Sequence, residues 1–291
     1  MFFKMFFVLS LMVLGVMGCE EKSEATTSDS VILMIGDGMG KNHVLCAAKD
    51  KDLYLLTLPV RGMVKTRSAD SKVTDSAASA TAYACGKKTN NHMLGKLPNN
   101  RDCLTIAEEC VKKGLNVGIY STDYSTGATP SAFYAHVFHR KQAPLIEKYK
   151  ERAKKKMDIE VPVEKISDIV SDRLNKLSAL NKNFFAMFEG AKIDVASTAN
   201  NLENMKQELY DFDLAIMKAV EFINENPNTT LIVLADHETG GLTEECVYTT
   251  KNHTGSDIPV YAYGKHADLF KGGQENTEIH DKIQKILFGK N

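Results

Sequence analysis

The sequence predicts an α/β fold in which helices cover both faces of a mostly parallel sheet, giving three α/β/α layers. Strand-like runs alternate with helical runs along most of the chain, which is typical of connected strand–helix–strand units. Three of the strand-like runs are continuously apolar, and acidic residues follow each of them. With 291 residues, 43% of them hydrophobic, the chain is long enough for one large domain with a substantial core.

The individual elements follow in order from local patterns. Strands are expected at 31–36, 60–66, 115–121, 184–188, 230–235 and 258–263. Helices are expected where apolar residues recur with helical spacing, at 41–50, 76–85, 102–114, 130–137, 166–177, 204–223 and 278–287. The charge-rich segment 141–165 is predicted to be a solvated helix and loop.

The amino terminus has the pattern of a bacterial lipoprotein signal. Residues 1–18 carry an early lysine and an apolar stretch too short to span a bilayer comfortably, which predicts a removable signal peptide. Cys19 is then the expected lipid anchor, and the polar residues 19–29 form a flexible tether to a domain over 30–291. We therefore expect an exported protein, either periplasmic or an outer-membrane-associated lipoprotein. The alternative is a plain secretory signal that is cut nearby.

Charge and cysteine content narrow the choice of partners. Lys and Arg number 36 and Asp and Glu number 37, so the formal net charge of -1 argues against binding to nucleic acid or to an anionic membrane surface. Five cysteines remain beyond Cys19, an odd number that leaves at least one without a partner in the chain: Cys46, Cys85, Cys103, Cys110 and Cys246. The first four fall in apolar helical patterns, and we interpret them as buried thiols. Cys103 and Cys110 lie two turns apart on the predicted helix, too far to pair.

Acidic side chains and a histidine follow three of the predicted strands. Asp37 follows the first strand, Glu189 and Asp194 follow the fourth, and Asp236 and His237 follow the fifth. Because ligands of open α/β sheets bind at the carboxyl ends of strands, we expect these side chains to meet at one edge. Neighbouring carboxylates resist ionising together unless cations lie among them, and Asp, Glu and His suit zinc and magnesium. Each acid alone could be a helix cap, but their shared position favours a metal site.

Ser76 begins a helical run of small residues. Thr74 or Asp75 can cap this helix, and a hydroxyl at a helix N-terminus faces unsatisfied N–H groups that favour an anion. Such a hydroxyl is well placed to attack a phosphoryl group. Taken alone, the run is more simply interpreted as a capped, alanine-rich packing helix, and the acids elsewhere in the chain favour the chemical interpretation.

Together these motifs resemble those of the alkaline phosphatase family of metal-dependent phosphomonoesterases. The similarity runs in order from about Val31 to the C-terminus, with a large deletion in the middle. It implies a shortened alkaline-phosphatase-like fold, zinc and magnesium as cofactors, and phosphate monoesters as substrates. By motif match, Ser76 is the nucleophile that becomes a phosphoserine. Arg140, eleven residues after Thr129, matches the arginine that grips two phosphoryl oxygens.

The resemblance also implies ligands for two zinc ions and one magnesium ion. For the zinc beside the nucleophile, which would lower the pKa of the serine hydroxyl, they are Asp37, Asp236 and His237. For magnesium they are Asp37, Thr129 and Glu189. For the other zinc, which would hold the leaving-group oxygen and activate water, they are Asp194 and His253.

Two positions depart from the family pattern. Many members carry an acid or a histidine where this chain has Gly127, so one outer contact to magnesium is predicted to be lost. Thr198 stands where the family has a histidine ligand of the other zinc, and a hydroxyl is a poor substitute for imidazole. His266 or His280 would have to reach into the site to replace it. We therefore expect reduced turnover or a need for high metal concentration.

The leading hypothesis is an exported or lipid-anchored phosphomonoesterase that releases inorganic phosphate. A homodimer is a possible assembly. One alternative is a degenerate member that binds phosphate or metal without turnover, which Thr198 and the central deletion would explain. Another is a phosphodiesterase or sulfatase of the same superfamily, although Arg140 and the pair of Thr129 and Glu189 favour a monoester.

Overall fold

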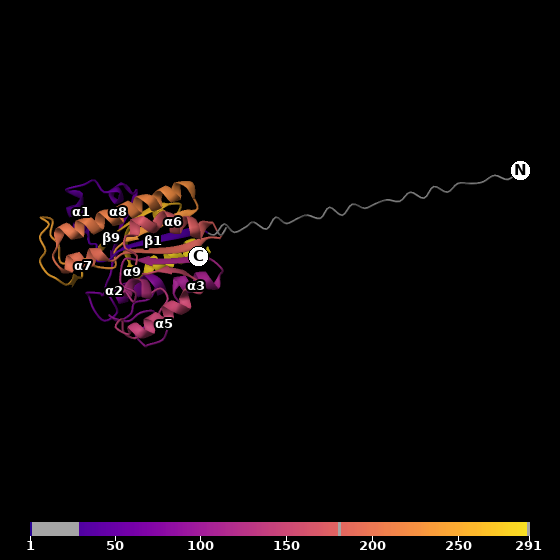
Figure 1. Ribbon diagram of the computed structural model, residues 1–291, viewed down its shortest axis with the longest axis horizontal. Helices are drawn as coiled ribbons and strands as arrows, with labels where there is room; N and C mark the ends of the chain where they lie inside the picture. Colours follow the sequence, from indigo (N-terminus) through magenta and orange to yellow (C-terminus); the bar gives the residue numbers. More distant parts are fainter. Residues whose placement is uncertain (2–28, 180–181, 290–291) are drawn as a thin grey trace.

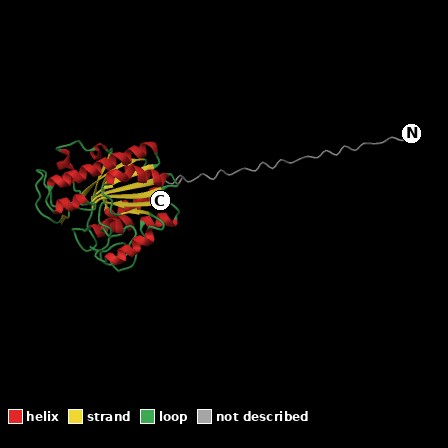
Figure 2. Ribbon diagram, in the orientation of Figure 1, coloured by secondary structure: helices red, strands yellow, loops and turns green. Residues whose placement is uncertain are grey.

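The computed structural model describes residues 1, 29–179 and 182–289. Its main feature is a sheet of eight strands in the order β10-β2-β9-β6-β1-β5-β3-β4, with helices on both sides (Figures 1 and 2). The strands are β1 (Ser30–Gly36), β2 (Val60–Lys65), β3 (Asn116–Ser121), β4 (Asp158–Glu160), β5 (Phe184–Gly190), β6 (Thr229–Leu234), β9 (Ile258–Gly264) and β10 (Gly272–Glu275). Neighbouring strands are parallel except that β9 runs antiparallel to both β2 and β6. The predicted three-layer, mostly parallel fold is confirmed.

The helices form one layer on each face of the sheet. In Figure 1, α1, α6 and α8 lie above the sheet, whereas α2, α3 and α5 lie below it. Helix α8 contacts α1, α6 and α7, and α2 contacts α3, α4 and α9. The helices are α1 (Lys41–Ala48), α2 (Ser76–Cys85), α3 (Ile106–Lys112), α4 (Ala128–Ser131), α5 (Ala143–Ala153), α6 (Ile166–Ser178), α7 (Lys192–Thr198), α8 (Leu202–Glu225) and α9 (Asn276–Phe288), with 3₁₀ turns at Tyr54–Thr57 and Ala267–Phe270.

The three central strands form the core and set the position of the site. Strands β1, β5 and β6 are buried along their whole length, as their continuous apolar sequences predict. Ile35 of β1 lies opposite Glu189 of β5 and Leu234 of β6, so all three strands end at the same level. Large side chains such as Phe185 are fully buried here, and each stabilises the fold by roughly 1.5–3 kcal/mol. Residues that follow the strands therefore emerge together at one rigid edge.

Two predicted helices have different bounds in the structure. The helix expected at 130–137 is wrong, because α4 ends at Ser131 and the backbone of Val137 instead pairs with Leu94. The helix expected at 102–114 begins only at Ile106, because Thr105 caps it in a capping box with Glu108. The short strands β4 and β10 carry little apolar signal and were not predicted. In the first helix a contact with another part of the chain overrides the local pattern, whereas in the second a local cap sets the first residue.

The expectation of four buried free thiols is wrong for three of the cysteines. Cys46 is bonded to Cys246 and Cys85 to Cys103, so three of the four residues interpreted as buried thiols are in disulfides. Cys110 is buried and free, as predicted. The pairing depends on the fold, because one bridge joins residues 200 positions apart in the sequence.

The predicted signal peptide (1–18) and tether (19–29) lie outside the described residues, apart from residues 1 and 29. Among the helices that the structure does describe, none is both long and apolar enough to cross a bilayer.

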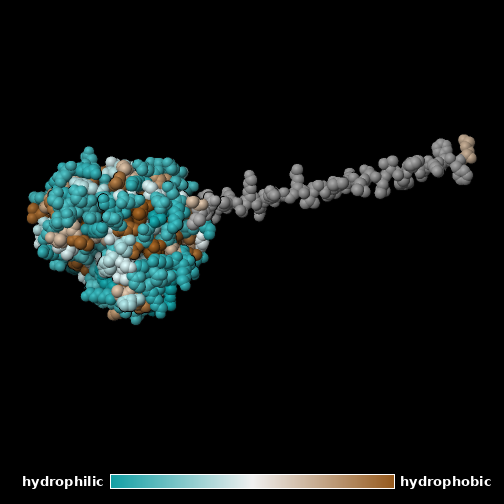
Figure 3. Space-filling model, viewed as in Figure 1, coloured by the Kyte–Doolittle hydropathy of each residue, from teal (hydrophilic) through white to brown (hydrophobic). Residues whose placement is uncertain are grey.

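The face of the domain shown in Figure 3 is mostly hydrophilic, with apolar side chains scattered over it. Phe138 and Val195 are examples of exposed apolar side chains. Single exposed apolar side chains are common on protein surfaces and do not by themselves indicate a binding site.

Candidate active site

The carboxyl edge of the sheet gathers the first set of predicted ligands. Asp37 follows β1, Asp236 and His237 follow β6, and one ligand atom from each lies within 4.8 Å of the others. His237 Nε2 is 3.1 Å from Asp236 Oδ2 and 3.5 Å from Asp37 Oδ1. The Gly38 N–H donates to Asp236 Oδ1 at 3.1 Å and orients that carboxylate. Two carboxylates and one imidazole are a donor set that zinc accepts.

A second set of ligand atoms lies directly beside the first. Asp194 of α7 and His253 form a group with His237, again within 4.8 Å. His253 is held by the small sheet of β7 (Glu238–Thr239) and β8 (His253–Thr254), in which Thr239 pairs with His253. The two imidazole rings stack with centroids 3.5 Å apart. The structure thus brings together the predicted residues of both zinc groups.

Hydrogen bonds orient both histidines for ligation. His253 Nδ1 lies 3.1 Å from the Thr74 carbonyl, which can only accept, so Nδ1 carries the proton and Nε2 is left bare. Thr239 Oγ1 donates to Asp194 and lies 3.2 Å from His237 Nδ1, which therefore acts as the donor. His237 Nε2 then faces the carboxylates with its lone pair. This is the arrangement of imidazoles that are ready to bind a metal ion.

Ser76 is the first residue of α2, and its hydroxyl points into this group. Its Oγ lies 3.2 Å from His237 Nε2, and the side chain is buried. Ser79 Oγ donates to the Asp236 carbonyl and Tyr83 OH donates to the Ala235 carbonyl, both at 2.7 Å. The helix is therefore anchored along its length to the end of β6, which places its N-terminus over the ligands.

Arg140 lies in the loop after α4 and reaches the same helix end. Its backbone N–H donates to the His92 carbonyl at 2.7 Å, and Nη1 donates to Asp75 Oδ2 at 3.2 Å. Asp75 also accepts from the N–H groups of Ala78 and His92, so it caps α2 and holds Arg140 at once. Burial raises the pKa of Asp75, but these N–H groups and the guanidinium outweigh it and lower that pKa. The roles of Asp75 and His92 as partners of Arg140 were not predicted from the sequence.

The predicted magnesium ligands lie on the β5 side of Asp37. Glu189 is the last residue but one of β5 and is fully buried, and its Oε2 accepts a short hydrogen bond from Ser121. Thr129 of α4 is buried as well. Asp123, which sequence reasoning missed, lies in the loop after β3 and raises the pKa of Glu189 in addition to the effect of burial. Its signal was present in the sequence, because it too is an acid directly after a predicted strand.

The electrostatics of the group fit bound cations. Burial, together with the charges of Asp236 and Asp194, raises the pKa of Asp37. Within the described residues, Asp37 Oδ1, Glu189 Oε1 and Thr129 Oγ1 are buried and have no hydrogen-bond partner. Buried acceptors without donors are costly, and divalent cations with oxygen preference would satisfy them. The residues present therefore fit zinc at the histidine side and magnesium at the Glu189 side.

Other polar residues lie outside these groups. Thr198 is exposed at the end of α7 and belongs to neither ligand group. His266 contacts Asp29, and His280 lies beside Gly86, so neither replaces the missing imidazole. His136 bonds to the Gly95 carbonyl and to Glu108, so its role is structural.

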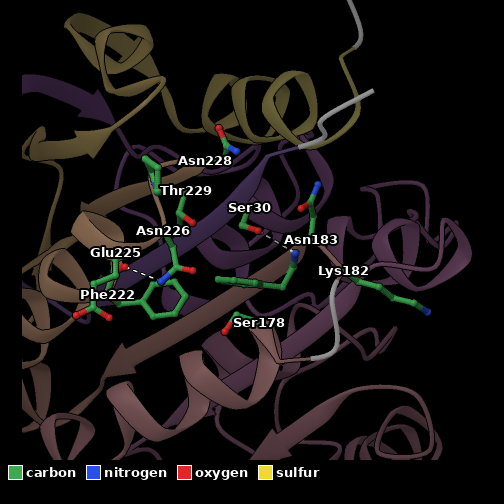
Figure 4. Close-up of a pocket in the computed structure, with 11 residues that line it drawn as sticks. Ser30, Ser178, Lys182, Asn183, Phe222, Glu225, Asn226, Asn228 and Thr229 are labelled. Carbon is green, nitrogen blue, oxygen red and sulfur yellow. Dashed lines mark hydrogen bonds between the residues drawn. The ribbon is translucent and has the colours of Figure 1, made fainter. Parts of the chain in front are cut away.

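A cavity of about 290 Å³ opens at the opposite edge of the sheet (Figure 4). It is lined by residues at the amino ends of the strands, among them Ser30 of β1 and Thr229 of β6. Lys182 and Glu225 lie at its rim, and no group of three potential metal ligands was found there or anywhere else in the described chain outside the two groups above. In sheets of this type ligands bind at the carboxyl ends of strands, so the candidate active site is at the other edge.

Comparison with known proteins matches this chain to one family. The alkaline phosphatase family model matches residues 28–162, 162–248 and 244–288. Alkaline phosphatase 4 of Bacillus subtilis is 27% identical over 421 aligned positions, which cover 92% of this chain and 91% of the relative. The alkaline phosphatase of Schizosaccharomyces pombe is 30% identical, and there the match covers 73% of this chain and 56% of the relative.

Solved structures agree with the sequence comparison. The alkaline phosphatase of the Antarctic bacterium TAB5 superposes with a TM-score of 0.82 at 28% identity, covering 89% of this chain and 97% of that one. A variant of the TAB5 enzyme holds Mg in its M3 site. The alkaline phosphatase of Thermus thermophilus shares the fold with a TM-score of 0.75 at 17% identity, covering 90% of this chain and 93% of that one.

Proposed function

The chain belongs to the alkaline phosphatase family, and on this premise we propose that it hydrolyses phosphate monoesters through a phosphoserine formed on Ser76. The observation that carries the proposal is the position of the Ser76 hydroxyl. Ser76 begins α2, and its hydroxyl oxygen lies 3.2 Å from Nε2 of His237, the residue that both ligand groups share. The helix N-terminus offers N–H groups and a positive dipole end to a phosphoryl group.

The residues divide the reaction into two displacements. Ser76 Oγ forms a bond to phosphorus and gives up its proton, while the bond from phosphorus to the ester oxygen breaks and the leaving alcohol gains a proton. Arg140 binds two phosphoryl oxygens and offsets their charge. Water then attacks the phosphoserine, inorganic phosphate leaves, and Ser76 regains its proton. Asp75 holds Arg140 beside the start of α2, so the phosphoryl group that Arg140 binds would lie next to the Ser76 hydroxyl.

Zinc and magnesium are the proposed cofactors. Asp37, Asp236 and His237 would hold the zinc beside Ser76, Asp194 and His253 would hold the other zinc, and Asp37, Thr129 and Glu189 would hold magnesium. When bound, such ions lower the pKa of the serine hydroxyl and of water and stabilise negative oxygens. Two observations support this assignment: the Nε2 atoms of His237 and His253 are unprotonated, and buried carboxylate oxygens of the site have no hydrogen-bond partner among the described residues.

Replacement of the nucleophile tests the proposal. Ser76→Ala should lower the hydrolysis of p-nitrophenyl phosphate, assayed with added zinc and magnesium, by at least about a thousandfold. Mass spectrometry of the wild-type protein quenched in acid should find a phosphoryl group on the peptide that contains Ser76. Ser171→Ala, on the exposed face of α6, is the matched control and should keep full activity. Equal activity of Ser76→Ala and the control would contradict the proposal.

A second candidate function is binding of phosphate or metal without turnover. Thr198 favours it, because only Asp194 and His253 among the predicted ligands remain for the other zinc. In that case the wild-type protein would bind metal but show no more hydrolysis than Ser76→Ala. Parallel assays with bis-p-nitrophenyl phosphate and p-nitrophenyl sulfate cover the phosphodiesterase and sulfatase alternatives, and we expect the monoester to be hydrolysed fastest.

We also propose that the protein is exported and anchored by a lipid on Cys19. The two disulfides support export, because disulfides persist in oxidising compartments. Metabolic labelling with a palmitate analogue should mark the wild-type protein and not Cys19→Ala. Equal labelling of both, or no labelling of the wild type, would contradict the anchor. A homodimer remains a proposal, which light scattering of the purified protein would test.

A further inference from the structure

The space beside Gly127 is filled by another side chain. A Cβ atom built on Gly127 would lie 2.1 Å from Asp123 Oδ2 and 2.5 Å from Asp123 Cγ. The carboxyl group of Asp123 therefore occupies the volume that a side chain at position 127 would need. The backbone of Gly127 has an ordinary negative φ of -51°, so the glycine is required by this contact and not by backbone strain.

Hydrogen bonds within one tight turn hold Asp123 in this place. Its N–H donates to Ser121 Oγ at 2.8 Å, and Ser121 Oγ in turn donates to Glu189 Oε2. Asp123 Oδ1 accepts from the Tyr124 N–H at 2.8 Å, which leaves Oδ2 to face Gly127. The Gly127 N–H closes the turn by donating to the Tyr124 carbonyl at 2.8 Å. Asp123 is thus tied through Ser121 to the carboxylate of Glu189.

The atoms next to this turn lack a positive partner. Glu189 is fully buried and Thr129 is 1% exposed, yet Glu189 Oε1 and Thr129 Oγ1 accept no hydrogen bond from any described residue. Asp123 adds a further negative charge that acts on both Glu189 and Asp37. Such a concentration of carboxylates is stable only with a cation or protons among them. Magnesium suits the place, because it keeps several waters and accepts carboxylates that reach it through those waters.

We propose that Asp123 is an outer carboxylate of the magnesium group formed by Asp37, Thr129 and Glu189, and that it replaces a side chain missing at Gly127. The outer contact to magnesium that Gly127 cannot make is then made by Asp123, four positions earlier in the same loop. This inference rests on the proposed magnesium binding, but not on turnover by Ser76. Asp123 is a positioning residue: it orients the water shell of the ion and adds negative charge next to Glu189.

A magnesium titration of the zinc-loaded, full-length protein tests the inference. Asp123→Ala should weaken magnesium binding about 10- to 100-fold, the usual effect of removing a partner that acts on a metal through its bound ligands. The affinity is followed by calorimetry and by the magnesium-dependent rise of the unfolding temperature. Asp123→Asn keeps the bond to the Tyr124 N–H but removes the charge, and should also weaken binding. Asp172→Ala, an exposed acid of α6, is the matched control and should change nothing.

The decisive variant returns the carboxylate to position 127. Gly127→Asp alone should impair magnesium binding or stability, because the new side chain collides with Asp123. In the double variant Asp123→Ala/Gly127→Asp the space is free, and magnesium affinity should recover to within about tenfold of the wild type. Wild-type affinity in both Asp123 variants would overturn the inference, as would a double variant no better than Asp123→Ala. Magnesium binding does not depend on the Ser76 hydroxyl, so Ser76→Ala should still bind magnesium. The titration therefore tests this inference even if the wild-type enzyme proves inactive.

Discussion

Arg140 Nη1 lies 3.2 Å from Oδ2 of Asp75, the residue that directly precedes Ser76. One carboxylate therefore links the cap of α2, the proposed nucleophile and the proposed phosphate-binding arginine. Asp75 is itself held by the N–H groups of Ala78 and His92, so it is not free to follow Arg140 if the arginine moves. The position of the guanidinium is consequently determined by the same turn that positions the serine.

Replacement of Asp75 by asparagine should separate these two roles. Asparagine is as good an N-cap as aspartate, so the unfolding temperature should stay close to that of the wild type. The charged hydrogen bond to Arg140 contributes about 1.5–3 kcal/mol, and its loss should weaken inhibition by inorganic phosphate roughly 10- to 100-fold. Asp75→Ala, which also loses the cap, should be less stable by about 1 kcal/mol. Unchanged phosphate affinity in Asp75→Asn would show that Arg140 needs no such partner.

Thr198→His should strengthen the group formed by Asp194 and His253. Residues 194 and 198 lie one turn apart on α7, so a histidine at 198 projects from the same face as Asp194. A third protein ligand completes the usual set of a catalytic zinc, and zinc affinity should rise at least about tenfold, with a higher rate. Elemental analysis and the p-nitrophenyl phosphate assay measure both. Val195→His, exposed on the same helix, is the control, and an equal gain in that variant would exclude a site-specific effect.

The fold was predictable because its strongest signals are local. The continuous apolar run of β1 is buried on both faces, and the acid after it needs only the parallel sheet to reach the site. The same holds for Glu189 and Asp236. Ser76 was correctly predicted to begin a helix because the cap is local. The side chain of Asp75 accepts a hydrogen bond from the N–H of Ala78, three residues along the chain. At these positions pattern and structure agree because residues near in sequence decide the outcome.

The remaining features depend on distant contacts that no local pattern encodes. Val137 leaves the predicted helix because its backbone pairs with Leu94. Cys46 is bonded to a cysteine 200 residues away, although its helical setting is typical of a buried thiol. Asp123 follows a predicted strand, as the other acids of the site do, but its link to Glu189 through Ser121 exists only in the folded chain. The sequence indicated which residue types the site needs, but only the packing shows which of them meet.

The bridge between Cys46 and Cys246 should stabilise the domain more than the bridge between Cys85 and Cys103. The first joins residues 200 positions apart and the second residues 18 apart. In the chain-entropy account, a loop of 15 residues is worth about 3 kcal/mol and a loop of 100 about 4.7 kcal/mol. Replacing each pair with alanine and measuring urea unfolding should show the larger loss for the longer loop. Equal losses would mean that the unfolded chain already holds the two ends near each other.

Metal removal should make the stability of the protein depend on pH through its buried carboxyls. Burial and the charge of Asp123 raise the pKa of Glu189 above its ordinary value of 4.5. Between 4.5 and that raised pKa, the unfolded state has lost the proton while the folded state still holds it, so the metal-free protein should lose stability as pH rises. Bound metal at about 100 times its Kd should restore about 2.7 kcal/mol.

The variant Glu189→Gln isolates this effect, because glutamine has the same shape and does not titrate. In EDTA it should be more stable than the wild type at pH 8 and lose that advantage toward pH 5, whereas magnesium should stabilise it less than the wild type. Thermal unfolding at several pH values, with and without magnesium, measures both trends. Glu151→Gln, which removes an exposed carboxylate of α5, should follow the wild type at every pH. If Glu189→Gln were less stable than the wild type at pH 8 without metal, the buried carboxylate would have a partner other than a cation.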